Sequence, residues 1–241
     1  MSSSPMGLLS GQPWWLQQGV GVAAVVLWLG MLAAAAVKLR QLGSDTSIAG
    51  HKREWSRKLV HIGTGAVVPL AWLFGIDRVI AIPAAAAVTI GAAINHRTRL
   101  LPAIEDVGRH SYGTIAYGAS ITLLLVLFWP TQADAVCAGV VVMALGDGLA
   151  GVIGSWIPSP SWSLFGHRKS VIGTTVMAAT GLLVLLVMAA VSRALGAAPA
   201  PDWGPLVAIA LIATLLEQLA WLGLDNLTVP IVCGWLWASW R

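Results

Sequence analysis

The sequence contains few charged side chains, and acidic residues are scarcer than basic ones. Of its 241 residues only 10 are Asp or Glu, charged residues make up 10% of the chain, and hydrophobic residues make up 57%. Together with a mean hydropathy of +0.80, this composition excludes an ordinary soluble domain. No polar stretch is long enough for a second, soluble domain. We therefore expect a single integral membrane domain over residues 1–241.

Other absences narrow the class further. The 2 cysteines, Cys137 and Cys233, lie in apolar runs and match no metal-ligand spacing, so we interpret them as small packing residues. Residues 1–19 contain no Lys or Arg, and the first apolar run continues to Val37. This pattern argues against a cleaved signal peptide, and we expect the first helix to remain in the mature protein.

Long apolar runs dominate what remains, and because they are continuous they predict helices rather than the alternating strands of a barrel. At ~1.5 Å per residue the last run reaches only ~21 Å, short of a ~30 Å hydrocarbon core. The expected fold is therefore all-α, a bundle of seven or eight membrane helices. We predict the helices at about Val20–Val37, Leu59–Phe74, Val79–Ile94, Gly113–Trp129, Ala135–Ile153, Val171–Ser192, Pro205–Gly223 and Leu227–Trp240.

Basic residues set the expected orientation, since loops rich in Lys and Arg stay in the cytosol. With the N-terminus outside, the outer side receives only Arg78, Arg193 and Arg241. The sequence pI of 9.5 does not indicate a nucleic-acid partner, because the basic residues lie in short loops and not on one folded face. The cytosolic side receives Lys38, Arg40, Lys52, Arg53, Arg57, Lys58, Arg97, Arg99, Arg109, Arg168 and Lys169.

Two carboxylates, Asp147 and Glu217, lie inside apolar runs. A charge at membrane depth costs roughly 2.5–3.5 kcal/mol on insertion scales, so such residues usually face a protein interior and have a function there. Each lies ~18 Å along its predicted helix from the outer end, which places both in the inner third of the membrane. Carboxylates below a cytosolic ring of Arg and Lys suit a phosphate-bearing ligand and Mg²⁺.

Two cationic clusters stand at predicted cytosolic helix ends. Arg57 and Lys58 precede His61 by four and three residues, so all three share one helical face, although membrane anchoring alone also explains the two cations. Arg168, Lys169 and Ser170 resemble part of a phosphate-binding Walker loop, but its upstream glycines are missing. A P-loop enzyme is therefore rejected, while an anion site at a helix N-terminus, or simple anchoring, remains open.

Small and polar residues surround the other candidates. Gly146 and Gly148 flank Asp147 and give a literal dinucleotide-binding pattern, which is spurious inside a membrane helix. Both glycines allow close approach, either of a neighbouring helix or of a ligand. Asp225 and Asn226 form a turn or helix cap, or else face Asp147 as oxygen ligands.

The polar stretch Glu105–Thr114 is denser in polar groups than a plain connection between two spans needs, although Glu105 and Arg109 could form an ordinary helical ion pair.

Taken in order, these motifs resemble the polyprenol kinase family, the CTP-dependent membrane enzymes that include dolichol and phytol kinases. The likeness runs from about Glu54 to Pro230, and the length of the chain is closest to the phytol kinase branch. Where that branch often has a second Asp, this chain has Gly151. The motifs that carry the resemblance are Arg57-Lys58-x-x-His61, Gly146-Asp147-Gly148-x-Ala150, Lys169-Ser170 with Gly173-Thr174, Glu217, and Asp225-Asn226-x-Thr228-Val229-Pro230.

The resemblance implies transfer of the γ-phosphoryl group of CTP to the primary hydroxyl of phytol or a similar isoprenoid alcohol. It divides the chain into a helix and basic loop (1–50), a catalytic core (51–230) and a tail (231–241). It implies catalytic roles for Asp147, Glu217 and His61, with either carboxylate as the base, and Mg²⁺ on Asp147 and Asp225. The implied nucleotide-binding residues are Arg57, Lys58, Gly146, Gly148, Arg168, Lys169, Ser170 and Asn226.

Other functions stay open from the sequence. A phosphatidate cytidylyltransferase or a CTP-dependent diacylglycerol kinase would use the same nucleotide and metal, although the basic run followed by Gly-His-Gly-Gly of the former is absent. An ion- or proton-coupled transporter would also bury carboxylates, but we find no duplicated motif. Phytol chemistry would indicate a bacterial inner or thylakoid-type membrane, and the sequence also allows a homo-oligomer.

Overall fold

The apolar runs form helices, as the sequence predicts. The computed structural model describes residues 9, 11–41, 49–98, 112–196, 199–219 and 221–241, and of residues 49–54 only the backbone. Their helices are α1 (Trp14–Gln41), α2 (Ala49–Thr64), α3 (Val67–Leu73), α4 (Arg78–Thr98), α5 (Gly113–Phe128), α6 (Ala133–Trp156), α7 (Val171–Ala194), α8 (Trp203–Gln218) and α9 (Asp225–Ser239). Strands β1 (Ser161–Leu164) and β2 (His167–Ser170) form the hairpin between α6 and α7.

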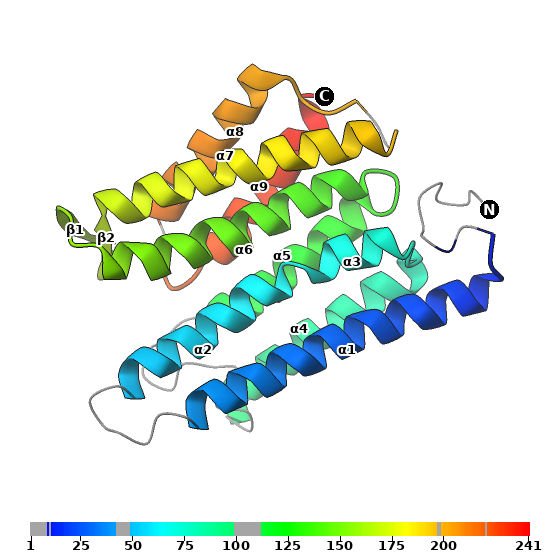
Figure 1. The fold of residues 1–241 in the computed structure, drawn as a ribbon, viewed down its shortest axis with the longest axis horizontal. Coiled ribbons are helices and arrows are strands. Elements are labelled where there is room, and N and C mark those ends of the chain that lie inside the picture. Colours follow the sequence, from blue (N-terminus) through cyan, green and yellow to red (C-terminus); the bar gives the residue numbers. More distant parts are fainter. Residues whose placement is uncertain (1–8, 10, 42–48, 99–111, 197–198, 220) are drawn as a thin grey trace.

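Four of these helices, α1, α4, α6 and α7, are long and apolar enough to cross a membrane. The all-α class is therefore confirmed, and the protein has several candidate membrane spans. Helices α5 and α8 are apolar but shorter. Figure 1 shows the long helices running side by side, with the hairpin at the end of the bundle that lies away from the N-terminus.

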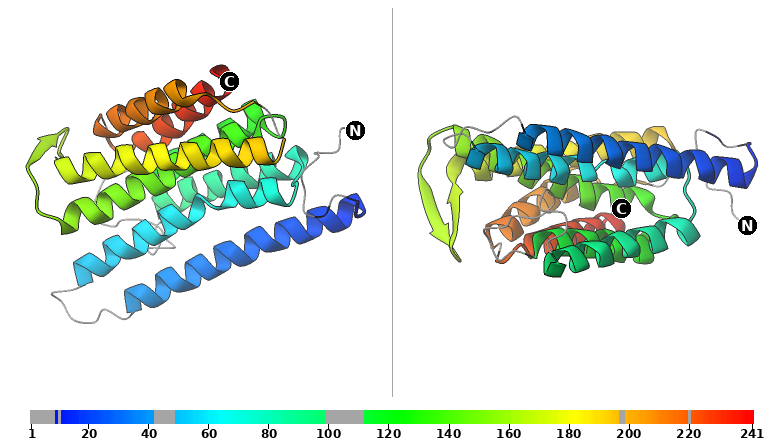
Figure 2. Two further views of the ribbon diagram at one scale, coloured as in Figure 1. Left: turned by 45° about the horizontal axis from the view of Figure 1, so that its top comes forward. Right: turned by 90° about the horizontal axis from the view of Figure 1, so that it is seen from below.

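Helix α6 is the centre of the bundle. It packs against α7 and α9 most extensively and also touches α2, α3, α5 and α8, whereas α1 lies at one edge (Figures 1 and 2). Of the most apolar window in each helix, 61% is buried in α6, against 17% in α1 and 6% in α4. Apolar faces that no other helix covers suit contact with lipid. A polar side chain on α6 is therefore held inside protein.

Glycines bring the backbones of α6 and α9 together. A Cβ atom at Gly139 would lie 2.3 Å from the backbone oxygen of Pro230, and one at Gly234 would lie 3.0 Å from that of Ala135. Contacts this short leave no room for a side chain, so these positions need glycine. The close packing fixes the start of α9, with Asp225, relative to α6.

The second apolar run differs from the single helix predicted for Leu59–Phe74. Helix α2 starts earlier, so the basic stretch is helical and not a loop, and the run breaks between Thr64 and Val67. At the break, the Gly65 and Ala66 amides donate to oxygens three residues back. A Cβ atom at Gly65 would lie 2.3 Å from Ala144 Cβ, so the break lets α2 pass close to α6.

The hairpin is the element that the sequence interpretation missed, since a loop was expected over Gly154–Ser170. Leu164 pairs with His167, and the two loop residues, Phe165 and Gly166, have φ values of 49° and 79°. Two consecutive positive φ values are typical of the type I′ turn, whose twist matches that of a hairpin.

The connection between the last two helices also differs from the prediction. Helix α8 ends before the predicted Gly223, and α9 begins with Asp225 instead of Leu227. Leu222 and Gly223 both have positive φ values, so the chain turns there. The turn brings Asp225 and Asn226 into the first turn of α9.

Candidate active site

Asp147 lies on α6 and receives two side chains from α2. Lys58 Nζ donates to Asp147 Oδ2 at 3.0 Å and to its backbone oxygen at 3.2 Å, and His61 Nε2 lies 3.4 Å from the same Oδ2. Lys58 and His61 are three residues apart on one helix and share a face, as predicted, and both reach the same carboxylate. The pair with Lys58 is largely buried, with 11% of the lysine and 19% of the aspartate side chain exposed.

Gly151 makes room for this pair. A Cβ atom on Gly151 would lie 2.5 Å from Lys58 Nζ and 2.6 Å from its Cε. Any side chain at this position would move the ammonium group. At the position where the phytol kinase branch often has a second Asp, Gly151 thus leaves space, and the ammonium group of Lys58 occupies it.

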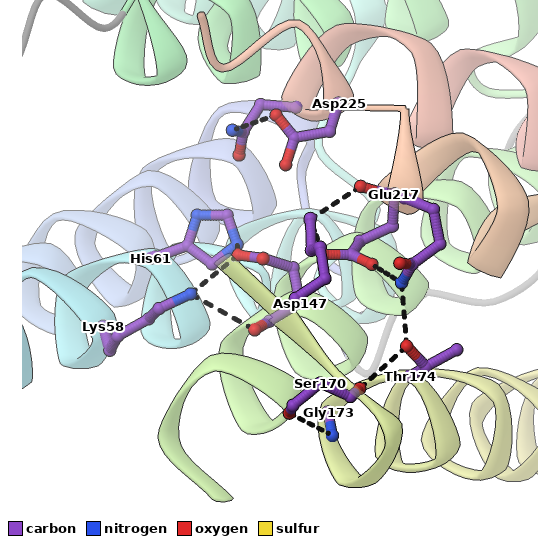
Figure 3. A network of polar contacts seen from close by, with 11 residues as sticks. Lys58, His61, Asp147, Ser170, Gly173, Thr174, Glu217 and Asp225 are labelled. Atoms are coloured by element: carbon purple, nitrogen blue, oxygen red, sulfur yellow. Dashed lines mark hydrogen bonds and ion pairs between the residues drawn. The ribbon is translucent and has the colours of Figure 1, made fainter. Parts of the chain in front are cut away.

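A second lysine–carboxylate pair lies beside the first. Lys169, on β2, donates to Glu217 Oε1 and to the Glu217 backbone oxygen, the latter at 2.8 Å. Gln218 Nε2 donates to the other carboxylate oxygen of Glu217 at 2.8 Å and to Thr174 Oγ1 at 3.0 Å. Lys169 thereby joins the hairpin to the end of α8, and Gln218 joins that end to the start of α7 (Figure 3).

Asp225 is the third carboxylate of the site. It is only 8% exposed and lies close enough to Asp147, Glu217 and Lys169 to interact with them electrostatically. Asn226 Nδ2 lies 3.4 Å from Asp225 Oδ1. Among the residues that the structure describes, no Lys, Arg or His lies within ion-pair distance of Asp225.

These groups form one polar cluster inside the bundle, which we call the carboxylate cluster: Lys58, His61, Asp147, Lys169, Glu217 and Asp225 (Figure 3). The cluster has three carboxylates and two lysines. This excess of negative charge favours an added cation. Burial strengthens each of these electrostatic interactions relative to water. Within the described ranges, no three Asp, Glu, His or Cys side chains are arranged around a common metal position.

Other predicted residues lie nearby. Ser170 is the N-cap of α7, and its Oγ accepts from the Gly173 amide at 3.1 Å. Arg57 lies close enough to His61 to interact electrostatically. Arg168 alternates with Lys169 along β2, and its Nε donates to Ser161 Oγ at 3.2 Å. The roles predicted for these residues in nucleotide binding stay predictions.

The glycines beside Asp147 pack against neighbouring helices. A Cβ atom at Gly146 would meet Met177 Sδ at 2.6 Å, and one at Gly148 would meet Ile62 Cγ1 at 2.3 Å. Helix packing is sufficient to explain both residues, which is one of the two readings that the sequence allowed. A direct role of either glycine with a nucleotide stays a prediction.

Tyr117 and Asp134 are among the buried polar residues that the sequence interpretation missed. Tyr117 on α5 stacks on His61, with ring centroids 4.8 Å apart. Asp134, in the first turn of α6, is 1% exposed. The sequence pattern that could have revealed them is a polar side chain within or beside an apolar run. The stretch 105–111, with its predicted polar cluster, lies outside the described residues. Tyr112 follows it directly, and its backbone N–H donates to the backbone oxygen of Leu222 at 3.0 Å, three residues before Asp225 in the chain.

A comparison with known proteins identifies the family of this chain. The chain is 34% identical, over 227 residues, to a protein from Synechocystis sp. named phytol kinase, and the matched stretch covers 94% of each chain. No protein-family model and no solved structure matches the chain. The likeness to the phytol kinase branch of the polyprenol kinases, inferred above from short motifs, is confirmed over nearly the whole length. The chain therefore belongs to the phytol kinase family.

Proposed function

We propose that this protein transfers the γ-phosphoryl group of CTP to the primary hydroxyl of phytol or a similar long-chain isoprenoid alcohol. Family membership makes it a phosphotransferase with an alcohol acceptor and a nucleotide donor. The observation that carries the proposal is the buried Lys58–Asp147 pair next to the Lys169–Glu217 pair. Phosphoryl transfer needs both charges, cations for the phosphates and a carboxylate near the nucleophile.

The lysines are the phosphate-binding groups of this proposal. In the protein without nucleotide, each ammonium group is held by a carboxylate and by a backbone oxygen. A lysine has a long flexible stem, so either can turn toward phosphate oxygens while it stays near its carboxylate. Arg57 adds positive charge from the same helix as Lys58, and Arg168, Ser170 and Asn226 stay candidates for the nucleotide.

Asp147 is the proposed base. The alcohol oxygen forms a bond to the γ-phosphorus, the bond from that phosphorus to the β-bridging oxygen breaks, and CDP leaves. The alcohol proton passes to the carboxylate of Asp147, with His61 beside it. Glu217 is the alternative base, although its carboxylate is occupied by both Lys169 and Gln218.

The site residues fit a magnesium ion. Asp225 is buried and lacks a basic partner within the described part of the chain, and Asp147 is its electrostatic neighbour. Mg²⁺ commonly takes one or two protein carboxylates and completes its shell with water and substrate phosphates, so a pair of aspartates is sufficient. Bound there, it would neutralise charge on the transferring phosphoryl group.

The membrane arrangement follows from the distribution of charge. We infer seven or eight crossings in one integral domain over residues 1–241, with the N-terminus outside and the carboxylate cluster facing the cytosol. Both substrates would then reach the site directly, the nucleotide from the cytosol and the alcohol from the bilayer. Phytol as substrate would suggest a bacterial inner or thylakoid-type membrane.

The test is a transfer assay with purified protein in detergent. Labelled CTP or ATP is incubated with Mg²⁺ and with phytol, geranylgeraniol, farnesol, a longer polyprenol, diacylglycerol or phosphatidate, and the labelled lipid is identified. We expect label from the γ-phosphate on an isoprenoid alcohol, release of CDP, and loss of activity with EDTA. Release of pyrophosphate with phosphatidate would instead identify a cytidylyltransferase, and labelling of diacylglycerol alone a diacylglycerol kinase.

A further inference from the structure

Tyr117 has a buried hydroxyl group without a partner. The side chain lies on α5 and is only 5% exposed, and within the described residues its Oη makes no hydrogen bond. An unsatisfied buried polar group costs about 1–3 kcal/mol. A phenylalanine at this position would avoid that cost, so the hydroxyl calls for an explanation.

The hydroxyl lies at the junction of α2, α5 and α6, beside the carboxylate cluster. The Tyr117 ring stacks on His61, and Tyr117 interacts electrostatically with Asp147. A Cβ atom at Gly65 would lie 3.4 Å from Tyr117 Oη, so the hydroxyl lies against the break between α2 and α3.

A second buried atom without a hydrogen bond among the described residues belongs to His61, whose ring contacts that of Tyr117. His61 Nε2 is buried and has no hydrogen-bond partner in the part of the chain that the structure describes, although Asp147 Oδ2 is 3.4 Å away. One hydroxyl group of a ligand can satisfy both residues, since it accepts from a phenol and donates to an imidazole nitrogen or a carboxylate.

We propose that Tyr117 binds the hydroxyl oxygen of the lipid alcohol, an inference that rests on the function proposed above. Tyr117 donates to this oxygen, and the alcohol donates its own proton toward Asp147 or His61. The chemistry favours an alcohol over a phosphate, because Tyr117 is neutral and is packed among membrane helices, where an uncharged ligand group is much cheaper to bury than a phosphate. The lysines remain available for the nucleotide.

In the reaction, Tyr117 orients the nucleophile and does not exchange its proton. Its hydrogen bond holds one lone pair of the alcohol oxygen, and a second lone pair is left to attack the γ-phosphorus. The alcohol proton goes to the carboxylate, the new oxygen–phosphorus bond forms, and the bond to CDP breaks. Correct orientation of a nucleophile lowers the barrier without any chemical change in the orienting group.

The experiment compares Tyr117→Phe with the wild-type protein. The substitution removes one oxygen and keeps the ring that stacks on His61. Tyr112→Phe is the matched control, because Tyr112 is the chain's other tyrosine and is 50% exposed. Four quantities are measured: kcat/KM for phytol, KM for CTP, hydrolysis of CTP to CDP without alcohol, and the rise in the melting temperature with phytol in the absence of nucleotide.

For Tyr117→Phe we expect kcat/KM for phytol to fall about 10- to 100-fold and the phytol-induced thermal shift to shrink. KM for CTP and the hydrolysis without alcohol should stay within about 2-fold, and the melting temperature without ligand should be unchanged or higher. Tyr112→Phe should match the wild type in all four measurements.

Two results would overturn the inference about Tyr117 while leaving the proposed function intact. One is wild-type transfer and phytol binding in Tyr117→Phe. The other is a lower melting temperature with unchanged kcat/KM per folded molecule, which would assign the hydroxyl to the fold. A wild-type protein that neither binds nor phosphorylates any lipid alcohol would overturn the proposed function itself, and the inference with it.

Discussion

Helix α6 carries two carboxylates that are shielded from solvent, Asp134 in its first turn and Asp147 beyond its middle, and the surroundings of the two differ. At one end Asp134 is 1% exposed and accepts hydrogen bonds from Ser192 Oγ at 3.0 Å, Trp237 Nε1 at 2.9 Å and Arg241 Nη2 at 3.2 Å. These donors come from α7, α9 and the end of the chain, so Asp134 joins three segments. Every contact is made by the protein itself.

Further along the helix, Asp147 belongs to a cluster whose polar groups are not all paired within the described residues. Within the described residues, its neighbour Asp225 is a carboxylate without a basic partner. Two buried polar atoms nearby, Tyr117 Oη and His61 Nε2, make no hydrogen bond to the same part of the chain. Burial alone therefore does not separate a structural carboxylate from a functional one. The separating feature is whether each carboxylate has its own donors: Asp134 has three, whereas Asp225 in the other cluster has no basic partner within the described residues.

The largest expected effect is on Asp147. Asp147→Asn should lower the rate of phosphoryl transfer by at least ~1000-fold, about 4 kcal/mol, because the amide cannot accept the alcohol proton. The melting temperature should change by only a few degrees. Transfer from labelled CTP and thermal unfolding in detergent measure the two effects, and full turnover of the variant would remove Asp147 from the mechanism.

Asp134→Asn should give the opposite pattern. An amide presents an N–H group to donors that need an acceptor, and it leaves Arg241 without its counter-charge, so we expect a loss of about 3 kcal/mol in stability. The rate per folded molecule should stay unchanged. Asp202→Asn is the matched control, because Asp202 is exposed and its side chain caps no backbone amide. An equal loss of stability in both variants would contradict the structural role of Asp134.

A smaller effect is expected from Lys169→Met. Loss of a charged contact to phosphate should raise KM for the nucleotide about 30-fold, or about 2 kcal/mol, with little change in KM for the alcohol. Initial rates at varied CTP and phytol measure both constants. Lys38→Met removes the same charge from an exposed position on α1 and should leave both constants unchanged.

The smallest effect concerns Gly151. In Gly151→Ala, the new methyl group displaces Lys58 Nζ from Asp147, and we expect a fall in kcat/KM of about 5- to 10-fold. Gly91→Ala, in α4, is the control, because a Cβ atom there meets nothing within 4 Å. Identical activity of the Gly151 variant and the control would show that Lys58 does not need its observed position.

Much of the site was predictable from the sequence. A carboxylate in a membrane helix is rare and costly, so Asp147 and Glu217 stand out from the apolar residues around them in the chain. Helical spacing predicted that Lys58 and His61 share a face, and both reach Asp147. The spacing could not reveal that Gly146 and Gly148 face Met177 and Ile62, because both readings require the same small residue.

The sequence by itself determined the apolar helices and the acidic positions within them, since hydropathy and charge are local properties of each segment. Only the tertiary structure decided which charges meet: Lys58 with Asp147, Lys169 with Glu217, and Arg241 with Asp134. These pairs are 48 to 107 residues apart in the chain. Their formation depends on backbone approaches, such as that of Gly139 to Pro230, which no local pattern encodes.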